Sequence, residues 1–154
     1  MNEKVLKENT IETEDIAEST LPKLDKLGRA YATGRRKTSI AKVWVKKGSG
    51  KIYVNGKIFT DYFSSDNHKM LITRPFEIIN QATEYDVKCS VKGGGPTGQA
   101  GAMVHGISKA LVMIDSNLKS TLRSEKLTTR DSRAVERKKP GRKKARRSFQ
   151  FSKR

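Results

Sequence analysis

Alternating apolar and polar positions predict two long strands in this chain. From Glu84 to Lys92 every second residue is apolar, and these residues are Tyr85, Val87, Cys89 and Val91. From Thr38 to Lys46 the two sets are Ala41, Val43 and Val45 on one face, and Ile40, Lys42, Trp44 and Lys46 on the other. Because side chains alternate across a strand, each segment has one face for a core and one for solvent or a partner.

A helix is predicted from Gln99 to Asp115, where apolar residues recur at every third or fourth position. These residues are Ala100, Met103, Val104, Ile107, Leu111 and Ile114. Between 70 and 82, Pro75 is expected to end any helix that precedes it and to allow another helix to begin there.

Turn signals separate the remaining elements. Ala30 to Thr33 is predicted to be a strand, and the basic run Gly34-Arg35-Arg36-Lys37 is predicted to be the turn after it. Lys51 to Val54 is a short strand, followed by a turn at Asn55-Gly56. These elements predict an α+β fold with a four-stranded, mostly antiparallel sheet and helices on one face.

The opposite face of that sheet would carry Trp44 between Lys42 and Lys46. Two interpretations stay open for it. Aromatic rings stack on bases and lysines neutralise phosphate, which would make this a binding surface. In the other interpretation Trp44 covers a small satellite cluster and the lysines keep the sheet solvated.

Charge divides the chain into three parts. The 154 residues carry a net charge of +17, distributed as −3 over residues 1–28, +9 over 29–125 and +11 over 126–154. We therefore predict a flexible acidic N-terminal extension, a globular domain over 29–125 and an extended basic tail over 126–154. A hydrophobic fraction of 34% suits one modest core. No apolar run approaches the roughly 18 to 20 residues that a membrane span needs.

The glycine loop from Gly93 to Gly98 follows a predicted strand and opens a predicted helix. Gly93, Gly95 and Gly98 have the spacing of a dinucleotide-binding fingerprint, but no sequence remains for the other strands of that fold. Glycines let backbone approach a phosphate closely, and amides at a helix start carry partial positive charge. Contact with a nucleic-acid backbone and a purely structural turn both stay open.

Residues for catalysis or metal binding are not evident in this pattern. His68 and His105 have no carboxylate or cysteine at a spacing typical of a metal site or a triad. We expect His105 to be a hydrogen-bonded structural residue and Cys89 to be buried in the core. The chain is therefore predicted not to be an enzyme and to need no cofactor and no metal.

Basic and aromatic residues dominate the tail, which has too few apolar anchors to fold alone. Pro140-Gly141 predicts a bend, and Phe149 and Phe151 offer rings for stacking on bases or ribose. Such a segment is expected to bind a polyanion, and its length would let it thread between RNA helices.

Several motifs in order resemble the bacterial-type small-subunit ribosomal protein S-nine family, over about Ala30 to Arg154. They are Gly34-Arg35-Arg36-Lys37-Thr38-Ser39, Gly93-Gly94-Gly95, Gly98-Gln99-Ala100-Gly101-Ala102, His105-Gly106-Ile107, Arg130-Asp131-Ser132-Arg133, Glu136-Arg137-Lys138-Lys139, Lys144-Ala145-Arg146-Arg147 and Gln150-Phe151-Ser152-Lys153-Arg154. The resemblance implies a β-α-β domain with a left-handed crossover, like that in domain four of the translocase elongation factor. It also implies a place in the head of the small ribosomal subunit, in cytoplasmic ribosomes, with an organellar ribosome left open.

The resemblance implies partners and site residues as well. The partners are small-subunit ribosomal RNA, peptidyl-site tRNA and neighbouring head proteins, with no membrane and no small-molecule substrate. The terminal pair Lys153 and Arg154 would approach the tRNA anticodon stem-loop. The expected ribosomal RNA contacts are Arg35, Arg36, Lys37, Gly93, Gly94, Gly95, Gln99, Arg130, Arg133, Arg137, Lys138, Lys139, Arg142, Lys143, Lys144, Arg146, Arg147, Phe149 and Phe151.

Three positions depart from the family pattern. Val104 stands where the family usually has Arg, Lys126 where it tends to have Gly, and Thr128 where it tends to have a bulky apolar residue. Two other classes of protein use similar features. A DNA-compacting protein would use the same tail, and a nucleotide-dependent enzyme would use the glycine loop.

Overall fold

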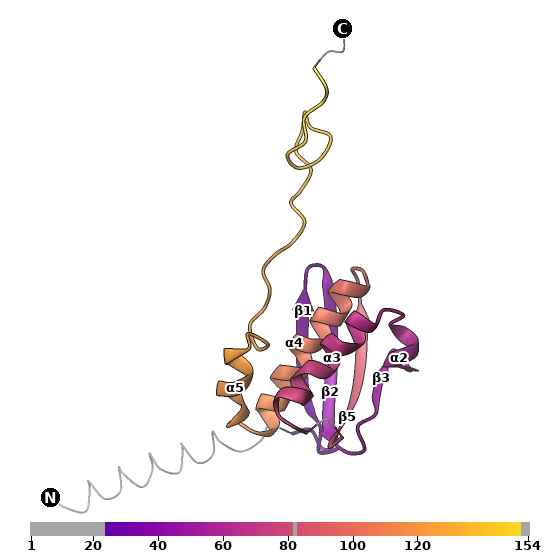
Figure 1. Ribbon diagram of the computed structural model, residues 1–154, viewed down its shortest axis with the longest axis vertical. Coiled ribbons are helices and arrows are strands. Elements are labelled where there is room, and N and C mark those ends of the chain that lie inside the picture. The colour runs from indigo at the N-terminus through magenta and orange to yellow at the C-terminus, as the bar shows by residue number, and fades with distance from the viewer. Residues whose placement is uncertain (1–23, 82, 152–154) are drawn as a thin grey trace, which may run out of the picture.

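The computed structural model describes residues 24–81 and 83–151 (Figure 1). Its elements in chain order are β1 (Ala30–Arg36), β2 (Ser39–Lys47), β3 (Ile52–Val54), β4 (Lys57–Ile58), α2 (Phe59–Tyr62), α3 (Asp66–Ile78), β5 (Tyr85–Lys92), α4 (Pro96–Ile114) and α5 (Leu118–Ser124). The α+β class is as predicted.

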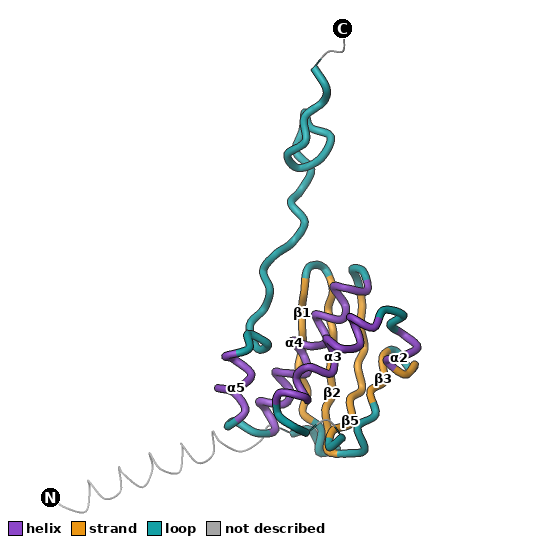
Figure 2. Tube along the Cα trace, in the orientation of Figure 1, coloured by secondary structure: helices purple, strands orange, loops and turns teal. Residues whose placement is uncertain are grey.

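The sheet has five strands in the order β1-β2-β5-β3-β4, rather than the four expected. Figure 2 shows β1, β2, β5 and β3 side by side. β2 pairs antiparallel with β1 and β5, whereas β3 pairs parallel with β5 and antiparallel with β4. β4 has only two residues, too few to show an alternating pattern, so the sequence did not reveal it. The parallel pair arises because the chain crosses the sheet through α3 before β5, and the sheet is therefore mixed.

The basic run that was predicted as a turn lies mostly in a strand. Gly34, Arg35 and Arg36 belong to β1, and only Lys37 and Thr38 form the turn into β2. Gly34 suits the strand because β1 passes closely against α4 there. A Cβ at this position would collide with the Ala102 carbonyl oxygen and the Gly106 backbone. The sequence pattern interpreted this glycine as part of a turn, whereas glycine is needed here because β1 packs closely against α4.

Helix α4 matches the predicted helix, but the expectation for Pro75 is wrong. α3 runs through Pro75 without a break. Proline cannot donate the helical hydrogen bond to the residue four positions earlier, which weakens one turn. Pro75 is buried with Ile72 and Phe76 on the inner face of α3, so packing offsets that loss.

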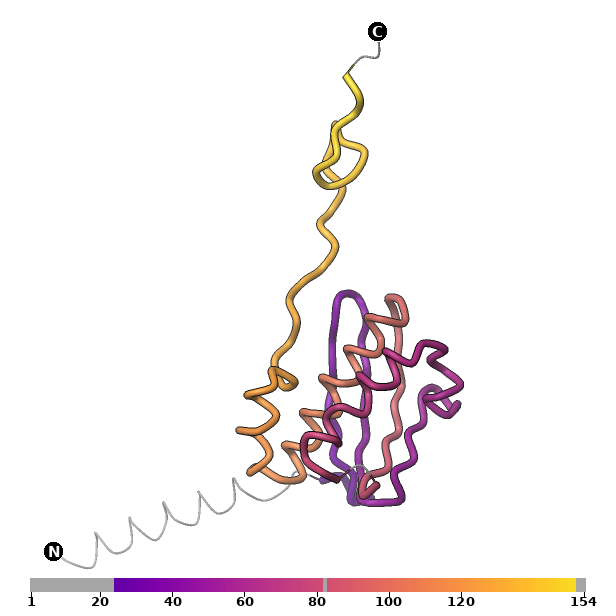
Figure 3. Tube along the Cα trace, viewed as in Figure 1, coloured from indigo at the N-terminus to yellow at the C-terminus, as the bar shows by residue number. Residues whose placement is uncertain are grey.

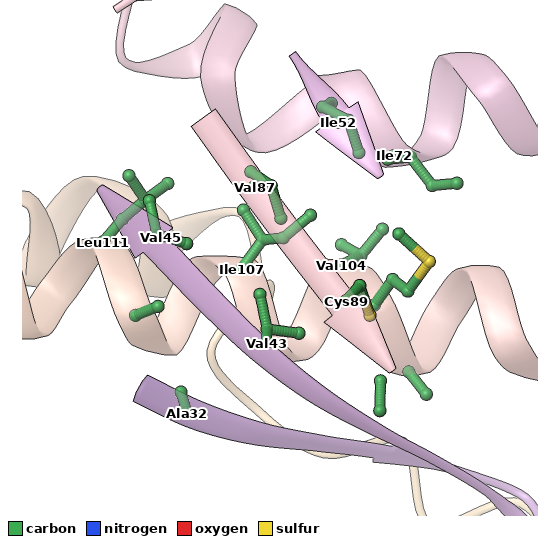
Figure 4. Packing of buried hydrophobic residues seen from close by; sticks show 14 of the residues in the cluster. Ala32, Val43, Val45, Ile52, Ile72, Val87, Cys89, Val104, Ile107 and Leu111 are labelled. Carbon is green, nitrogen blue, oxygen red and sulfur yellow. The ribbon is translucent and has the colours of Figure 1, made fainter. Parts of the chain in front are cut away.

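A single core lies between the sheet and helices α3 and α4. Figure 4 shows Val43 and Val45 of β2 and Val87 of β5 pointing toward Ile107 of α4. The alternation predicted for β2 and β5 is confirmed: the apolar sets are buried, including Cys89. Both helices lie on the same face, so no described element covers the other one (Figure 2). None of the described helices is long and apolar enough to cross a bilayer.

After α5 the chain contains no helix or strand as far as residue 151, and most of these residues are exposed. Figure 3 shows this segment leading away from the sheet. α5 ends at Ser124, two residues before the predicted start of the tail.

Candidate nucleic-acid interface

One end of the domain brings together three segments that are far apart in sequence: the β1–β2 turn, the glycine loop and the start of the C-terminal segment. Ser39 Oγ donates to the Gly93 carbonyl oxygen at 3.0 Å, which joins the turn to the loop. Arg36 Nε lies 3.4 Å from Asp131 Oδ2, which joins β1 to the C-terminal segment. Predicted site residues from all three motifs therefore share one surface region.

The glycine loop is shaped by left-handed backbone at Gly93 and Gly94, where φ is +75° and +64°. A Cβ at Gly94 would collide with Ser39 Oγ, so the loop packs against the turn as closely as glycine permits. Gln99 Nε2 donates to the Gly93 carbonyl at 3.2 Å, and Gln99 Oε1 accepts from Tyr62 Oη at 2.9 Å. Gln99 thus supports the loop from behind, while Gly93, Gly94 and Gly95 stay exposed.

The three basic residues of the hairpin have different surroundings. Arg35 and Lys37 are exposed, whereas Arg36 is half-buried. The Arg36 side chain lies across Gly101 of α4, where any Cβ would collide with it. Arg36 therefore has a packing and ion-pairing role, and Arg35 and Lys37 remain the accessible cations.

His105 connects α4 to β1 in this region. The backbone N–H of Arg35 donates to His105 Nδ1 at 3.2 Å. Burial lowers the pKa of His105, and the positive charges of Lys109 and Arg130 act in the same direction, against backbone hydrogen bonds to Thr128 and Arg35. A neutral imidazole with these partners is the structural histidine that the sequence predicted.

Asp131, at the start of the C-terminal segment, forms ion pairs with Arg36 and Arg133. Arg133 donates to its carboxylate through Nε at 3.0 Å and Nη2 at 2.9 Å, and through its own backbone N–H at 3.0 Å. These hydrogen bonds, with the nearby charge of Arg36, hold the pKa of the Asp131 carboxyl far below its usual range. The Arg133 side chain is still 81% exposed, so it remains accessible while this acid orients it.

Farther along, the chain folds back on itself around Glu136. Lys139 Nζ lies 3.0 Å from this carboxylate and Arg146 Nε 2.9 Å from it. Gly141 has φ of +70°, which allows the bend that Pro140-Gly141 predicted, and Arg142 Nη1 donates to the Arg146 carbonyl at 2.7 Å. The structure thus holds this part of the segment in a loop rather than fully extended.

Two aromatic rings lie beyond this loop. Lys143 Nζ is 5.7 Å from the centre of the Phe149 ring. Phe149 is 59% exposed and Phe151 is fully exposed. Large apolar side chains in that state contribute nothing to the core. Their exposure leaves both rings available to a partner.

The predicted tRNA contacts, Lys153 and Arg154, lie outside the described residues. Within the described ranges, no three His, Cys, Asp or Glu side chains gather closely enough to hold a metal ion. Val104 is buried at 5% exposure and lines the same shallow hollow as Arg35 and Arg36.

Two aromatic residues, Tyr31 and Tyr53, share the face of Trp44 but were not among the residues predicted from the sequence. Their place became visible only with strand pairing, which aligns Tyr31 with Trp44 and Tyr53 with Lys88. The alternate positions of the predicted strands at 30–33 and 51–54 could have indicated them.

The sequence of this chain matches a known protein family. The family model described as Ribosomal protein S9/S16 matches residues 34–154. The matched region begins within β1 and includes the glycine loop and the whole basic C-terminal segment.

Proposed function

The chain belongs to the ribosomal protein S9/S16 family, and from this premise we propose that it binds ribosomal RNA in the head of the small subunit of cytoplasmic ribosomes and contacts peptidyl-site tRNA through its C-terminal tail. Membership itself makes it a structural, non-enzymatic protein of the small ribosomal subunit. It works in translation as part of a ribonucleoprotein, with ribosomal RNA and other ribosomal proteins as partners.

The observation that carries the proposal is the exposed segment after α5. Residues 126–154 have a net charge of +11, and the described part of them contains no helix or strand. Like charges repel one another, so such a segment gains most by binding a polyanion and releasing its counterions. From Arg133 to Arg154 it could reach roughly 70 Å if fully extended, which is far enough to thread between RNA helices.

Arginine and lysine of this segment are proposed to hold it on ribosomal RNA. Arginine supports planar, bidentate contact with phosphate, while lysine supplies a point charge. The proposed residues are Arg130, Arg133, Arg137, Lys138, Lys139, Arg142, Lys143, Lys144, Arg146 and Arg147. The loop around Glu136 would have to open for all of them to reach RNA, and its exposed ion pairs cost little to break.

A second proposed contact lies at the end of the domain where the hairpin meets the glycine loop. Arg35 and Lys37 are exposed there, and the Gly93 to Gly95 backbone has no side chain to hinder a close approach. Arg36 and Gln99 support these groups from inside, so we assign them to positioning the contact. Phe149 and Phe151 are proposed to stack on bases or ribose.

Sedimentation with small ribosomal subunits tests the proposal as a whole. We expect the full-length protein to remain with the subunits through a high-salt wash. A DNA-compacting protein would instead bind duplex DNA as tightly as ribosomal RNA at matched salt, and a nucleotide-dependent enzyme would show saturable mononucleotide binding by calorimetry. Release into the soluble fraction would contradict our proposal.

Removal of Lys153 and Arg154 tests the proposed tRNA contact. The truncated protein should still enter the subunit, because the rest of the tail is intact, while peptidyl-site tRNA dissociates faster from subunits that carry it. Replacing both residues by Gln is the matched control for charge and should give the same result. Equal tRNA affinity in wild-type and truncated subunits would exclude this role.

We also propose that the crossover from β3 through α3 to β5 is left-handed, as the family resemblance implies. Figure 1 supports this sense, because α3 lies in front of the sheet with β5 to the left of β3. Parallel β-α-β connections are right-handed in about 98% of cases, so this hand would be a strong marker of the family fold.

A further inference from the structure

The face of the sheet opposite α3 and α4 carries a row of aromatic and basic side chains. Strand pairing aligns Tyr31 of β1 with Trp44 of β2, Trp44 with Lys88 of β5, and Lys88 with Tyr53 of β3. Tyr31 and Tyr53 are 42% and 41% exposed. The rings of Tyr31 and Trp44 are 5.3 Å apart between centres. Four neighbouring strands thus present one continuous line of side chains across the sheet.

Trp44 lies between two hollows on this face. One, of about 450 Å³, is lined by Arg29, Trp44, Lys51, Tyr53 and Lys88, among others. The second, of about 630 Å³, has Tyr31, Lys42 and Trp44 in its lining and reaches round the β1 edge of the sheet to Met113 of α4. Both volumes lie in the range of roughly 300 to 1,000 Å³ that is typical of ligand sites, so each hollow has room for a ring beside the indole.

The acids near this row are already engaged. Asp86 accepts from the backbone N–H groups of Ser49 at 2.8 Å and Lys51 at 3.1 Å, which lowers the pKa of its carboxyl. Asp25 pairs with Arg29 at 2.7 Å. Among the described residues, Lys42 and Lys88 have no acidic partner within 4 Å, so positive charge on this face is unbalanced.

We propose that this face binds single-stranded RNA, with bases stacked on Trp44 and Tyr53 and with Lys42 and Lys88 on the phosphates. The inference rests on the proposed function and adds a second RNA site on the domain itself. Strands lie about 4.8 Å apart, so the row from Tyr31 to Tyr53 spans about 14 Å and has room for more than one nucleotide.

Charge and ring exposure favour RNA over a protein partner. A lysine in the middle of the row would be buried at a dry protein interface, where an unpaired charge is costly, whereas a phosphate would neutralise it. Sheets that recognise RNA stack unpaired bases on aromatic side chains in the same way. Duplex RNA keeps its base faces stacked internally, so it is not expected to bind here.

The experiment uses Trp44 as the reporter, because it is the single tryptophan of the chain. A labelled single-stranded RNA oligonucleotide and a duplex of equal length are titrated into the full-length protein. Binding is followed by anisotropy of the label and stacking by tryptophan emission. We expect single-stranded RNA to reduce the emission of Trp44 roughly twofold or more, and duplex RNA to bind through the tail without changing it.

Variants on the row separate this site from the tail. Tyr53→Leu should raise the concentration needed for half-maximal quenching by about tenfold, since stacking on one base contributes roughly 1 to 3 kcal/mol. Lys88→Gln should raise it as well, because it removes a phosphate contact. Lys119→Gln is the matched control: it removes the same charge from an exposed position on α5 and should leave quenching unchanged. Circular dichroism spectra confirm that each variant is folded.

Two results would overturn the inference and leave the proposed function intact. One is tight RNA binding with unchanged Trp44 emission, and the other is equal quenching in the wild type and both row variants. Shielding of Trp44 from a soluble quencher only after head proteins are added would assign the face to a protein. Failure to bind any RNA would instead contradict the proposed function itself.

Discussion

At the scale of one residue, Lys126 stands in a backbone conformation that favours glycine. Its φ is +57°, in the left-handed region. It follows α5, and its N–H donates to the Arg123 carbonyl at 2.9 Å, while the Leu127 N–H donates to the Leu122 carbonyl at 3.1 Å. These two bonds form a Schellman motif, in which this position is usually glycine.

Lys126→Gly should therefore stabilise the domain. A side chain in left-handed backbone costs about 1 to 2 kcal/mol, and glycine removes that cost at the price of some chain entropy. We expect a gain of about 1 kcal/mol in the free energy of unfolding, measured with urea. Lys126→Ala is the control, because it removes the same charge but keeps the Cβ. Equal stability of the two variants would exclude backbone strain as the cause.

His105 links the pH dependence of stability to one side chain. Because the pKa of His105 is lowered in the folded state, the unfolded chain binds more protons below about pH 6.5. This contribution to stability is complete above that pH and is lost as the pH falls through the folded pKa.

We predict that the free energy of unfolding decreases from about pH 7.5 to about pH 5.5 and that His105→Asn flattens this decrease. Asparagine can still accept from Arg35 but does not titrate in this range. Thermal unfolding across the pH series measures the effect. A slope that persists in His105→Asn would assign the dependence to other groups.

At the scale of elements, the contact between β1 and α4 depends on two glycines. Gly34 lies against the Gly106 backbone, and a Cβ at Gly106 would meet Val43 of β2. The strand and helix therefore approach more closely than side chains would permit. This contact also sets the position of Arg35 and Lys37 beside the glycine loop.

Gly34→Ala should destabilise the domain by about 2 to 3 kcal/mol, the upper part of the range for overpacking a tightly packed site. The added methyl group has rigid backbone as its neighbour, so it can be accommodated only if β1 shifts away from α4. Gly95→Ala is the matched control, because a Cβ there meets nothing within 4 Å and φ is −109°. Urea titrations compare the two variants, and a loss in Gly95→Ala equal to that in Gly34→Ala would contradict this explanation.

At the scale of the whole molecule, positive charge increases toward the C-terminal part of the chain. Residues 29–125 carry +9 and residues 126–154 carry +11, while residues 1–28 carry −3. On the proposed function, the tail would therefore supply most of the phosphate contacts.

Removing residues 134–154 tests this division without disturbing Asp131 and its arginines. The removed segment holds ten basic residues, and each lost phosphate contact should reduce the slope of log affinity against log salt by roughly 0.7 to 0.9. We expect the slope for ribosomal RNA binding to fall by several units while a weaker affinity remains. Replacing the same ten residues by Gln is the control for length. An unchanged slope would contradict a dominant tail.

Much of the fold could be predicted because burial follows local periodicity. The inner faces of β2 and β5 and the long helix α4 were predicted correctly from alternation and from three- to four-residue spacing. The interruption at Pro75 was wrong because packing of Ile72 and Phe76 outweighs one lost hydrogen bond. The turn at Gly34 was wrong because a glycine reveals a backbone requirement without revealing whether its origin is a turn or a neighbouring helix.

The residues of the candidate site remain a prediction, and the structure adds only how they are arranged in space. The basic hairpin, glycine loop and tail were recognised as separate motifs, and the structure places the first two beside the start of the third. It also distinguishes Arg36 and Gln99, which are held by internal contacts, from Arg35 and Lys37, which are exposed. Spacing along the chain carries no information about such contacts.

The sequence by itself determined which residues of β2 and β5 face the core and where charge accumulates, because both depend on residue identity and on periodicity over a few positions. Only the tertiary structure decided the mixed sheet, the contact of Gly34 with α4, and the row of Tyr31, Trp44, Lys88 and Tyr53. These features depend on pairing between strands and on packing of a helix against a strand, which local periodicity does not specify. A shift of one residue in register would move each side chain of a strand to the opposite face.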